Sequence, residues 1–137
     1  MDASGFVIDS KLAETSYPLV SLSVCDVRLV DDTRWPWLIL IPRVNHAVEL
    51  IDLPPDIRVQ VWQEIDHVSR VLRDNLSPDK LNTAALGNQV RQLHIHVIGR
   101  YTDDPAWPMP VWGAGDAIPY DSDALASRLH TLRAALG

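Results

Sequence analysis

The segment that decides the fold reads Gln92-Leu93-His94-Ile95-His96-Val97-Ile98. Apolar and polar side chains alternate along it, and this is the period of a β-strand, because successive strand side chains point to opposite faces of a sheet. We expect a strand from Leu93 to Arg100, with the odd-numbered side chains of the segment in the core and Gln92, His94 and His96 on the other face. Two histidines and an amide on a rigid strand form the fixed platform that a catalytic site requires.

The residues alone leave three interpretations of His94 and His96 open. They are solvated side chains on the polar face of a half-exposed strand, or they are metal ligands, or one of them is a nucleophile or base at an anion site. A metal needs a third ligand, and no Asp, Glu or Cys follows the pair within a few residues. We therefore predict no metal and no cofactor, and the absence of a Glu at the required spacing also disfavours a cupin-like metalloenzyme.

Outward from this strand, the chain predicts an α+β fold in one domain spanning residues 1–137, with helices packed on an antiparallel sheet. Helices are indicated by capping residues followed by apolar side chains at helical spacing, and strands by short apolar runs bounded by turn residues. The predicted helices are Asp9 or Ser10 to Glu14, Pro54 to Asn75, and one that begins at Asp121 or Ser122; the predicted strands lie within Val20–Val30 and at Trp37–Ile41, Leu81–Leu86 and Leu93–Arg100.

Composition narrows the class of ligand. The chain has 12 Lys and Arg against 18 Asp and Glu, a net charge of −6, which argues against binding to a nucleic-acid duplex but leaves room for a small anion held by a few N–H groups. The single cysteine, Cys25, cannot form an internal disulfide and is expected to be a small buried hydrophobe. No signal-like start or membrane-length apolar run is found, so we expect a cytoplasmic protein without membrane contact.

The histidine segment and its flanks resemble the histidine-triad (HIT) family. The family motif is His-φ-His-φ-His-φ-φ, with φ apolar, and Gln92 stands in place of its first histidine. The stretch Gly87–Gln92 resembles the family's Gly-Gln-(Ser/Thr)-Val-x-His, Leu38–Arg43 resembles its strand and Pro-basic turn, and Glu49–Asp56 resembles its entry into the long helix. The resemblance runs from about Val24 to Trp112 and implies a HIT fold: an antiparallel sheet of about five strands with one long and one C-terminal helix.

By this resemblance the chain cleaves a nucleoside phosphate derivative at the α-phosphorus. His94 would be the nucleophile and form a nucleotidyl-histidine intermediate that water resolves. Its other ring nitrogen would donate to a backbone carbonyl, and His96 would donate to a phosphate oxygen. The N–H groups of Gln89 and Val90 would add donors where charge develops. Gln92 can form hydrogen bonds but cannot carry a proton at pH 7.

The resemblance also implies roles for residues outside the motif. Asp31 and Asp32 would face the ribose hydroxyls, although a strand-ending turn explains them equally well, and Asn82 would face the ligand from the preceding strand. Trp107 and Trp112, in a long loop after the motif, are candidates for contact with a partner subunit or for a lid, whereas the other three tryptophans, Trp35, Trp37 and Trp62, are assigned to the core or to an interface.

We therefore predict a homodimeric nucleotide hydrolase or nucleotidyl transferase that acts on a small nucleotide. The alternative is a non-catalytic nucleotide-binding module, in which Gln89 and Gln92 mark a site that has lost efficient turnover. Gln89 stands where many family members have Ser or Thr near the leaving group, which weakens any expectation of phosphoramidate cleavage.

Overall fold

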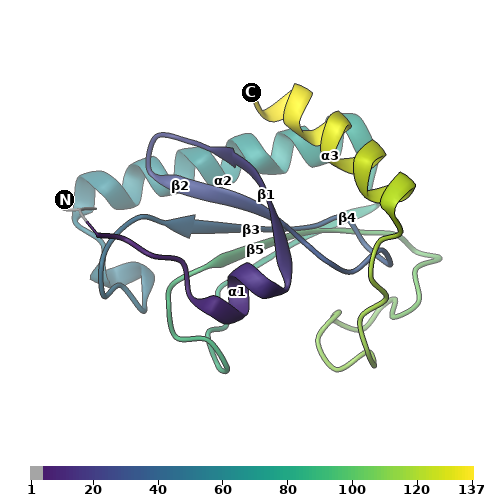
Figure 1. The fold of residues 1–137 in the computed structure, drawn as a ribbon, viewed down its shortest axis with the longest axis horizontal. Helices are drawn as coiled ribbons and strands as arrows, with labels where there is room; N and C mark the ends of the chain where they lie inside the picture. Colours follow the sequence, from purple (N-terminus) through teal and green to yellow (C-terminus); the bar gives the residue numbers. More distant parts are fainter. Residues whose placement is uncertain (1–4) are drawn as a thin grey trace.

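Five antiparallel strands form one sheet in the order β1-β2-β3-β5-β4, with helices on both of its faces (Figure 1). The computed structural model describes residues 5–137, so the prediction about the N-terminal start lies partly outside them. The strands are β1 (Ser16–Ser21), β2 (Cys25–Val30), β3 (Trp37–Pro42), β4 (Lys80–Ala84) and β5 (Ile95–Arg100); the helices are α1 (Ser10–Glu14), η1 (Leu50–Asp52), α2 (Pro55–Leu76) and α3 (Ser122–Leu136).

The predicted α+β class is confirmed, and the three predicted helices lie where their caps indicate. The Asp9 side chain accepts a hydrogen bond from the N–H of Lys11 at the start of α1, and the Asp121 side chain accepts one from the N–H of Ala124 at the start of α3. Pro54 precedes α2, where a missing N–H removes no helical hydrogen bond.

Several strand boundaries differ from the prediction, and β1 begins at Ser16, before the predicted stretch. Val20–Val30 contains the end of β1, a tight turn closed by the N–H of Leu22 on the carbonyl of Cys25, and β2. β4 ends at Ala84 instead of Leu86. β5 begins at Ile95 and not at Leu93, because the N–H of Leu93 donates to the carbonyl of Ala47 in the loop after β3 and not to a neighbouring strand.

One face of the sheet carries the main core, which is covered by α2 and α3. The apolar stripe of α2 is buried against core residues that include Leu93, just before β5, and Ile95 and Val97 of β5, on the face that the alternation predicts. Cys25 lies in this core and is fully buried. The α3 residues Leu132 and Leu136 complete it. Burial of a side chain of this size contributes roughly 1.5–3 kcal/mol, so this layer supplies the rigidity on which β5 depends.

The other face of the sheet carries α1 and the site. α1 has five residues, too few for a helix that is stable alone. It is held because Leu12 packs in a separate small cluster with Ile39 and Ile41 of β3. Figure 1 shows α1 in front of the sheet and α2 behind it. The sheet therefore has the main core on one face, under α2 and α3, and α1 with the histidines on the other face.

A buried ion pair fixes the loop that follows β5. Arg100 is 1% exposed, and its Nε lies 2.8 Å from Oδ2 of Asp104. Arg100 also donates to the side-chain oxygen of Asn82 at 3.0 Å and to the carbonyl of Met109 at 2.7 Å. Asp104 in turn accepts from three backbone N–H groups of the loop. This network holds the loop, with its two tryptophans, against the end of the sheet.

Candidate functional site

His94 and His96 lie side by side in a pocket of about 450 Å³ between α1 and the loop that joins β4 to β5. Their ring centroids are 4.9 Å apart, and the two residues are only 6% and 7% exposed. The interpretation of the pair as solvated side chains is therefore wrong. The pocket is lined by Lys11, Leu12, Glu14, Thr15, Leu86, Gly87, Asn88, Gln89, Val90, His94, His96 and Trp112.

The proton of His94 is fixed by the main chain. Its Nδ1 lies 2.7 Å from the backbone oxygen of Gln92. A carbonyl oxygen can only accept, so Nδ1 carries a proton and donates, and in the neutral ring Nε2 has the free lone pair. The predicted hydrogen bond to a backbone carbonyl is confirmed. The neutral tautomer of His94 thus has Nε2 as its free nitrogen, the form that a nucleophile or base needs.

The proton of His96 is fixed in the opposite way, by Trp37. The indole N–H of Trp37 donates to Nδ1 of His96 at 2.9 Å. Because an indole N–H can only donate, Nδ1 of His96 must accept, and in the neutral ring the proton sits on Nε2. Burial, together with the neighbouring His94, lowers the pKa of His96 from 6.5 to about 3. At neutral pH His96 is therefore an uncharged donor.

The strand register explains why Trp37 reaches this ring. β3 and β5 are antiparallel, with Trp37 opposite Ile98 and Ile39 opposite His96. Trp37 and His96 are thus diagonal neighbours on one face, a separation that long aromatic side chains span. The assignment of Trp37 to core or interface alone was incomplete, because periodicity places a residue on a face but does not give its cross-strand partner.

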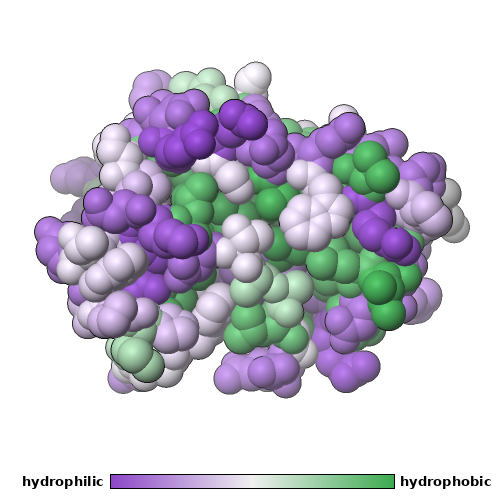
Figure 2. All heavy atoms as spheres, turned by 180° about the vertical axis from the view of Figure 1, so that it is seen from behind, coloured by the Kyte–Doolittle hydropathy of each residue, from purple (hydrophilic) through white to green (hydrophobic). Residues whose placement is uncertain are grey.

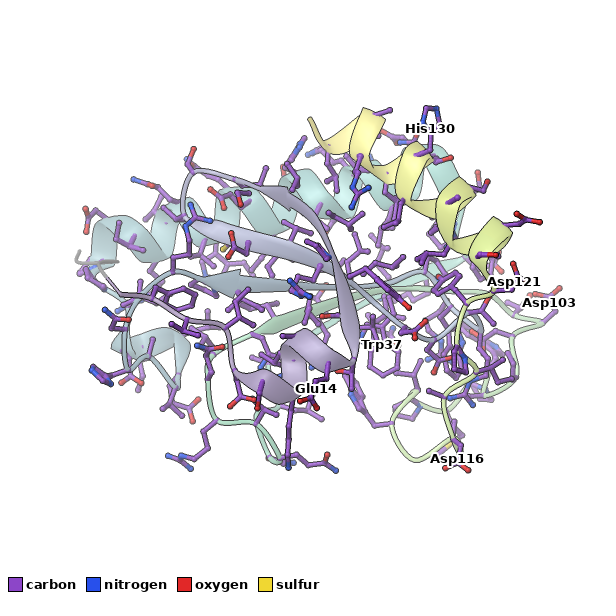
Figure 3. The ribbon with its side chains drawn as sticks, in the orientation of Figure 1. Glu14, Trp37, Asp103, Asp116, Asp121 and His130 are labelled. Atoms are coloured by element: carbon purple, nitrogen blue, oxygen red, sulfur yellow. The ribbon has the colours of Figure 1, made fainter. Side chains whose placement is uncertain are left out.

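Trp112 closes the aromatic side of the pocket. Its ring lies edge-on to His96, with centroids 5.0 Å apart, and edge-on to Trp37, with centroids 5.9 Å apart. This contact comes from the same chain, through the loop that Arg100 holds. The aromatic groups exclude water from one side of His96, which is the physical origin of its low pKa. Figure 3 labels Trp37 and, on α1, Glu14 of the pocket.

Unpaired backbone N–H groups line the opposite side. Gly87 has φ +67°, and the loop it opens runs into His94. Within the described part of the chain, no N–H group of residues 88–92 donates a hydrogen bond. Free N–H groups of consecutive residues form a concavity that suits an anion. Gln89 and Val90, which the sequence singled out as backbone donors, are both in the pocket wall.

Gln92 lies next to the pair in sequence, but its side chain turns away from the pocket. Its Oε1 accepts from the N–H of Asp9 at 2.9 Å, and its Nε2 donates to the carbonyl of Val7 at 2.9 Å. The amide thereby pairs with the backbone of the segment that leads into α1. The expected geometry, with Gln92 beside the histidines at the pocket mouth, needs correction: its backbone carbonyl contacts His94, and its side chain anchors the N-terminal segment.

Asp31 and Asp32 lie outside the pocket wall. Asp31 accepts from the N–H of Tyr120 at 2.9 Å. Asp32 is 1% exposed and forms an ion pair with Arg34 at 2.8 Å. Both carboxylates thus tie the turn after β2, one to the segment before α3 and the other to the neighbouring arginine. These contacts fit the interpretation of Asp31 and Asp32 as turn residues. To bind a ribose hydroxyl, each carboxylate would have to accept a further hydrogen bond beside the ones described here.

Asn82 and Trp107 also lie outside the pocket wall, around Arg100. The Asn82 side chain accepts from Arg100, as described above, and the ring of Trp107 packs 5.6 Å from its guanidinium carbon. Of the two loop tryptophans, Trp112 lines the pocket of its own chain and Trp107 is 36% exposed. Only Trp112 is therefore placed to contact a ligand of this chain.

Sequence reasoning missed the wall that α1 contributes. Lys11, Leu12, Glu14 and Thr15 belong to one short segment more than 70 positions away from the histidines, and no motif marks them. Their place follows from the anchoring of α1 by Gln92 and Leu12, which is a tertiary arrangement.

Among residues 5–137 no group of three or more His, Cys, Asp or Glu side chains is arranged to hold a metal ion. No helix in this range is long and apolar enough to cross a membrane.

The sequence and the fold of this chain are similar to those of known proteins. The family model described as the HIT domain matches residues 20–103. A histidine triad protein from Bradyrhizobium japonicum is 40% identical, with a TM-score of 0.94, over 96% of this chain and 98% of that one. One from Sinorhizobium meliloti is 36% identical, with a TM-score of 0.94, over 98% and 99%. One from Marinobacter aquaeolei is 40% identical, with a TM-score of 0.93, over 96% of both chains. No curated protein matches the chain.

Proposed function

The chain belongs to the HIT domain family, and from this premise we propose that it cleaves a small nucleotide at the α-phosphorus, with His94 as the nucleophile. The reaction is a hydrolysis or a nucleotidyl transfer. The observation that carries the proposal is the hydrogen bond from Nδ1 of His94 to the carbonyl of Gln92, because in the neutral ring it leaves Nε2 as the nitrogen with the free lone pair. Gln92, in place of the first histidine of the motif, would put this chain in a branch of the family.

The proposed first step forms a bond from Nε2 of His94 to the α-phosphorus and breaks the bond from phosphorus to the leaving group, which takes the electron pair. The hydrogen bond from Nδ1 stabilises the positive charge that develops on the ring. In the second step water attacks phosphorus, the P–N bond breaks with its electron pair returning to Nε2, and the attacking water releases a proton to the solvent. An acceptor other than water at this point would turn hydrolysis into transfer.

The other groups in the pocket suit the charge on phosphorus. The Nε2–H of His96 is a donor for a non-bridging oxygen, and the free N–H groups of Gln89 and Val90 are further donors. Fixed donors that are aimed at developing charge supply much of the rate enhancement in enzymes. Leu12 and Leu86 add apolar surface to the pocket, against which a nucleobase would pack.

The direct test is to trap the intermediate. The protein would be mixed with a panel of dinucleoside polyphosphates, nucleoside phosphoramidates and adenylated amines, quenched, and analysed for a nucleotidyl adduct on His94 by mass spectrometry, with products followed by phosphorus NMR. We expect an adduct in the wild type and none in His94→Ala. Turnover that survives His94→Ala would refute the nucleophile.

A non-catalytic nucleotide-binding module is the second candidate. The observation that favours it is the position of Gln92, whose side chain holds the N-terminal segment and leaves two imidazoles at the pocket. Nucleotide binding without turnover or adduct across the whole panel would establish this alternative and reject the first.

We further propose that the chain is a single domain in the cytoplasm and forms a homodimer. β4 is an edge strand that pairs only with β5 among the described strands, and it lacks the proline and the register shift that β1 contains. Trp62 and Val59 on α2 are at least half exposed, and Figure 2 shows hydrophobic surface among hydrophilic side chains on the side away from α1. Light scattering at micromolar concentration should give twice the mass of the chain, and a stable monomer would contradict the dimer.

A further inference from the structure

Trp37 and Gln92 decide where protons can be held near the reacting atoms. The indole N–H of Trp37 donates a hydrogen bond to Nδ1 of His96, and Nδ1 of His94 donates one to the carbonyl of Gln92. The Gln92 side chain forms its hydrogen bonds with the backbone of Val7 and Asp9. In the neutral rings, His94 has no proton on Nε2 and His96 offers only a neutral N–H at this position. The remaining titratable side chains in the pocket wall are Lys11 and Glu14, both on α1.

We propose that the indole N–H of Trp37 holds His96 as a neutral imidazole with its proton on Nε2, so that the site cleaves nucleotide bonds whose leaving group departs as an anion. This inference rests on the proposed function and specifies its substrate class. Trp37 is a positioning residue in this account, since it acts through His96 and is absent from the pocket wall.

The chemical reason lies in the acidity of a neutral imidazole. Protonating His96 would place a proton on Nδ1 and break the hydrogen bond from Trp37, so the indole opposes the cationic form. A neutral N–H stabilises an oxyanion by a hydrogen bond but does not transfer its proton to a leaving group near pH 7. The electron pair of the broken bond must therefore rest on the leaving group itself.

This restriction separates two kinds of nucleotide. In a phosphoanhydride the bridging oxygen leaves as part of a phosphate or polyphosphate anion, which is stable without a proton. In a phosphoramidate the leaving nitrogen needs a proton to depart as an amine. General acid catalysis contributes roughly 10²–10⁴-fold where it operates. We expect the site to lack this contribution and to select anhydrides and esters of acidic alcohols.

The first experiment reads the proton positions without relying on activity. Two-dimensional ¹H–¹⁵N NMR of the imidazole rings distinguishes the two neutral tautomers from the cation. We expect wild-type His96 to be neutral at pH 7 with the proton on Nε2, and Trp37→Phe to mix the tautomers and raise the pKa of His96. Trp112→Phe is the matched control, because Trp112 packs on the same ring without a hydrogen bond to it, and it should preserve the tautomer. A cationic or Nδ1-protonated His96 in the wild type would overturn the proposal.

The second experiment varies the leaving group. Single-turnover rates would be compared for the p-nitrophenyl ester, the phenyl ester and the amidate of AMP. We expect the wild type to cleave the nitrophenyl ester faster than the phenyl ester by a factor on the order of 10² or more, and the amidate not detectably. In Trp37→Phe the ratio of the two ester rates should fall, with a change in kcat larger than the change in KM.

Lys11→Met and Glu14→Gln test the two remaining titratable side chains of the pocket wall. We expect each variant to change the two ester rates by the same factor, because no proton passes from Lys11 or Glu14 to the leaving group. A selective loss of phenyl ester cleavage in either variant, or amidate cleavage as fast as nitrophenyl ester cleavage in the wild type, would overturn the proposal. If no ester is cleaved and no adduct forms, the proposed function fails and the leaving-group inference fails with it, whereas the NMR result still decides the role of Trp37.

Discussion

Replacing Gln92 by Ala tests whether this residue anchors α1 or acts on the substrate. The Gln92 side chain makes two hydrogen bonds, both to the backbone of the segment before α1, at Val7 and Asp9. Asp9 is also the cap of α1. Removing the amide therefore loosens the helix that forms one wall of the pocket, and it leaves the hydrogen bond from His94 to the backbone of residue 92 in place.

The magnitude follows from the two hydrogen bonds. A typical intramolecular hydrogen bond contributes about 0.5–1.5 kcal/mol, so the pair contributes about 1–3 kcal/mol. If this stability is local to the segment, the population in which α1 is detached rises by about 5- to 150-fold. Leu12 keeps its apolar contacts with Ile39 and Ile41, so we expect local opening and not global unfolding.

Hydrogen exchange measured by mass spectrometry resolves this effect. Peptides covering residues 5–16 should exchange about 5- to 150-fold faster in Gln92→Ala, while peptides from α2 remain unchanged. Gln92→Glu should be worse than Ala, because a carboxylate faces the carbonyl of Val7 without a donor. Gln89→Ala is the matched control, since that exposed side chain lies in the same loop and makes no hydrogen bond in the described part of the chain. Unchanged exchange at residues 5–16 in Gln92→Ala would refute the anchoring role.

Three further changes test the site and its support. His94→Ala should abolish turnover and preserve nucleotide affinity in titration calorimetry, because the nucleophile acts in the transition state; restoring histidine at position 92 should change the rate far less. Arg100→Met should lower the unfolding free energy in urea by roughly 3–5 kcal/mol, because the buried Asp104 carboxylate loses its cationic partner. Arg70→Met, at an exposed ion pair, should change it by less than about 1 kcal/mol. The pKa of His96 is about 3 in the folded chain and 6.5 when unfolded, so the unfolded state binds more protons between these pH values. The unfolding free energy measured in urea should therefore fall as the pH drops from 6.5 towards 3, by up to about 1.4 kcal/mol per pH unit. The fall should be smaller in His96→Gln.

Periodicity was sufficient for the parts of this fold that depend on a single segment. The alternation along β5 correctly assigned Ile95 and Val97 to the core and His96 to the other face. It could not give the partners of these residues across strands, because register is a property of two segments. Trp37 was therefore placed with the core, although its indole contacts His96. The wall formed by α1 was missed for the same reason.

The substitution of Gln92 for histidine can be understood from what each part of the residue does. Its backbone carbonyl orients His94, and any residue at this position supplies a carbonyl. Its side chain pairs with a backbone N–H and a backbone carbonyl two residues apart, as a neighbouring strand would, and an amide presents the required donor and acceptor side by side. A neutral imidazole also has one donor and one acceptor, but they lie on opposite edges of its ring and cannot form this pair. The glutamine thus couples the pocket wall to the strand, while Trp37 and a main-chain carbonyl fix the protons of the two remaining histidines. In this arrangement the chemistry proposed for His94 does not require a third imidazole, and the identity of residue 92 should affect substrate binding through α1 more than the chemical step.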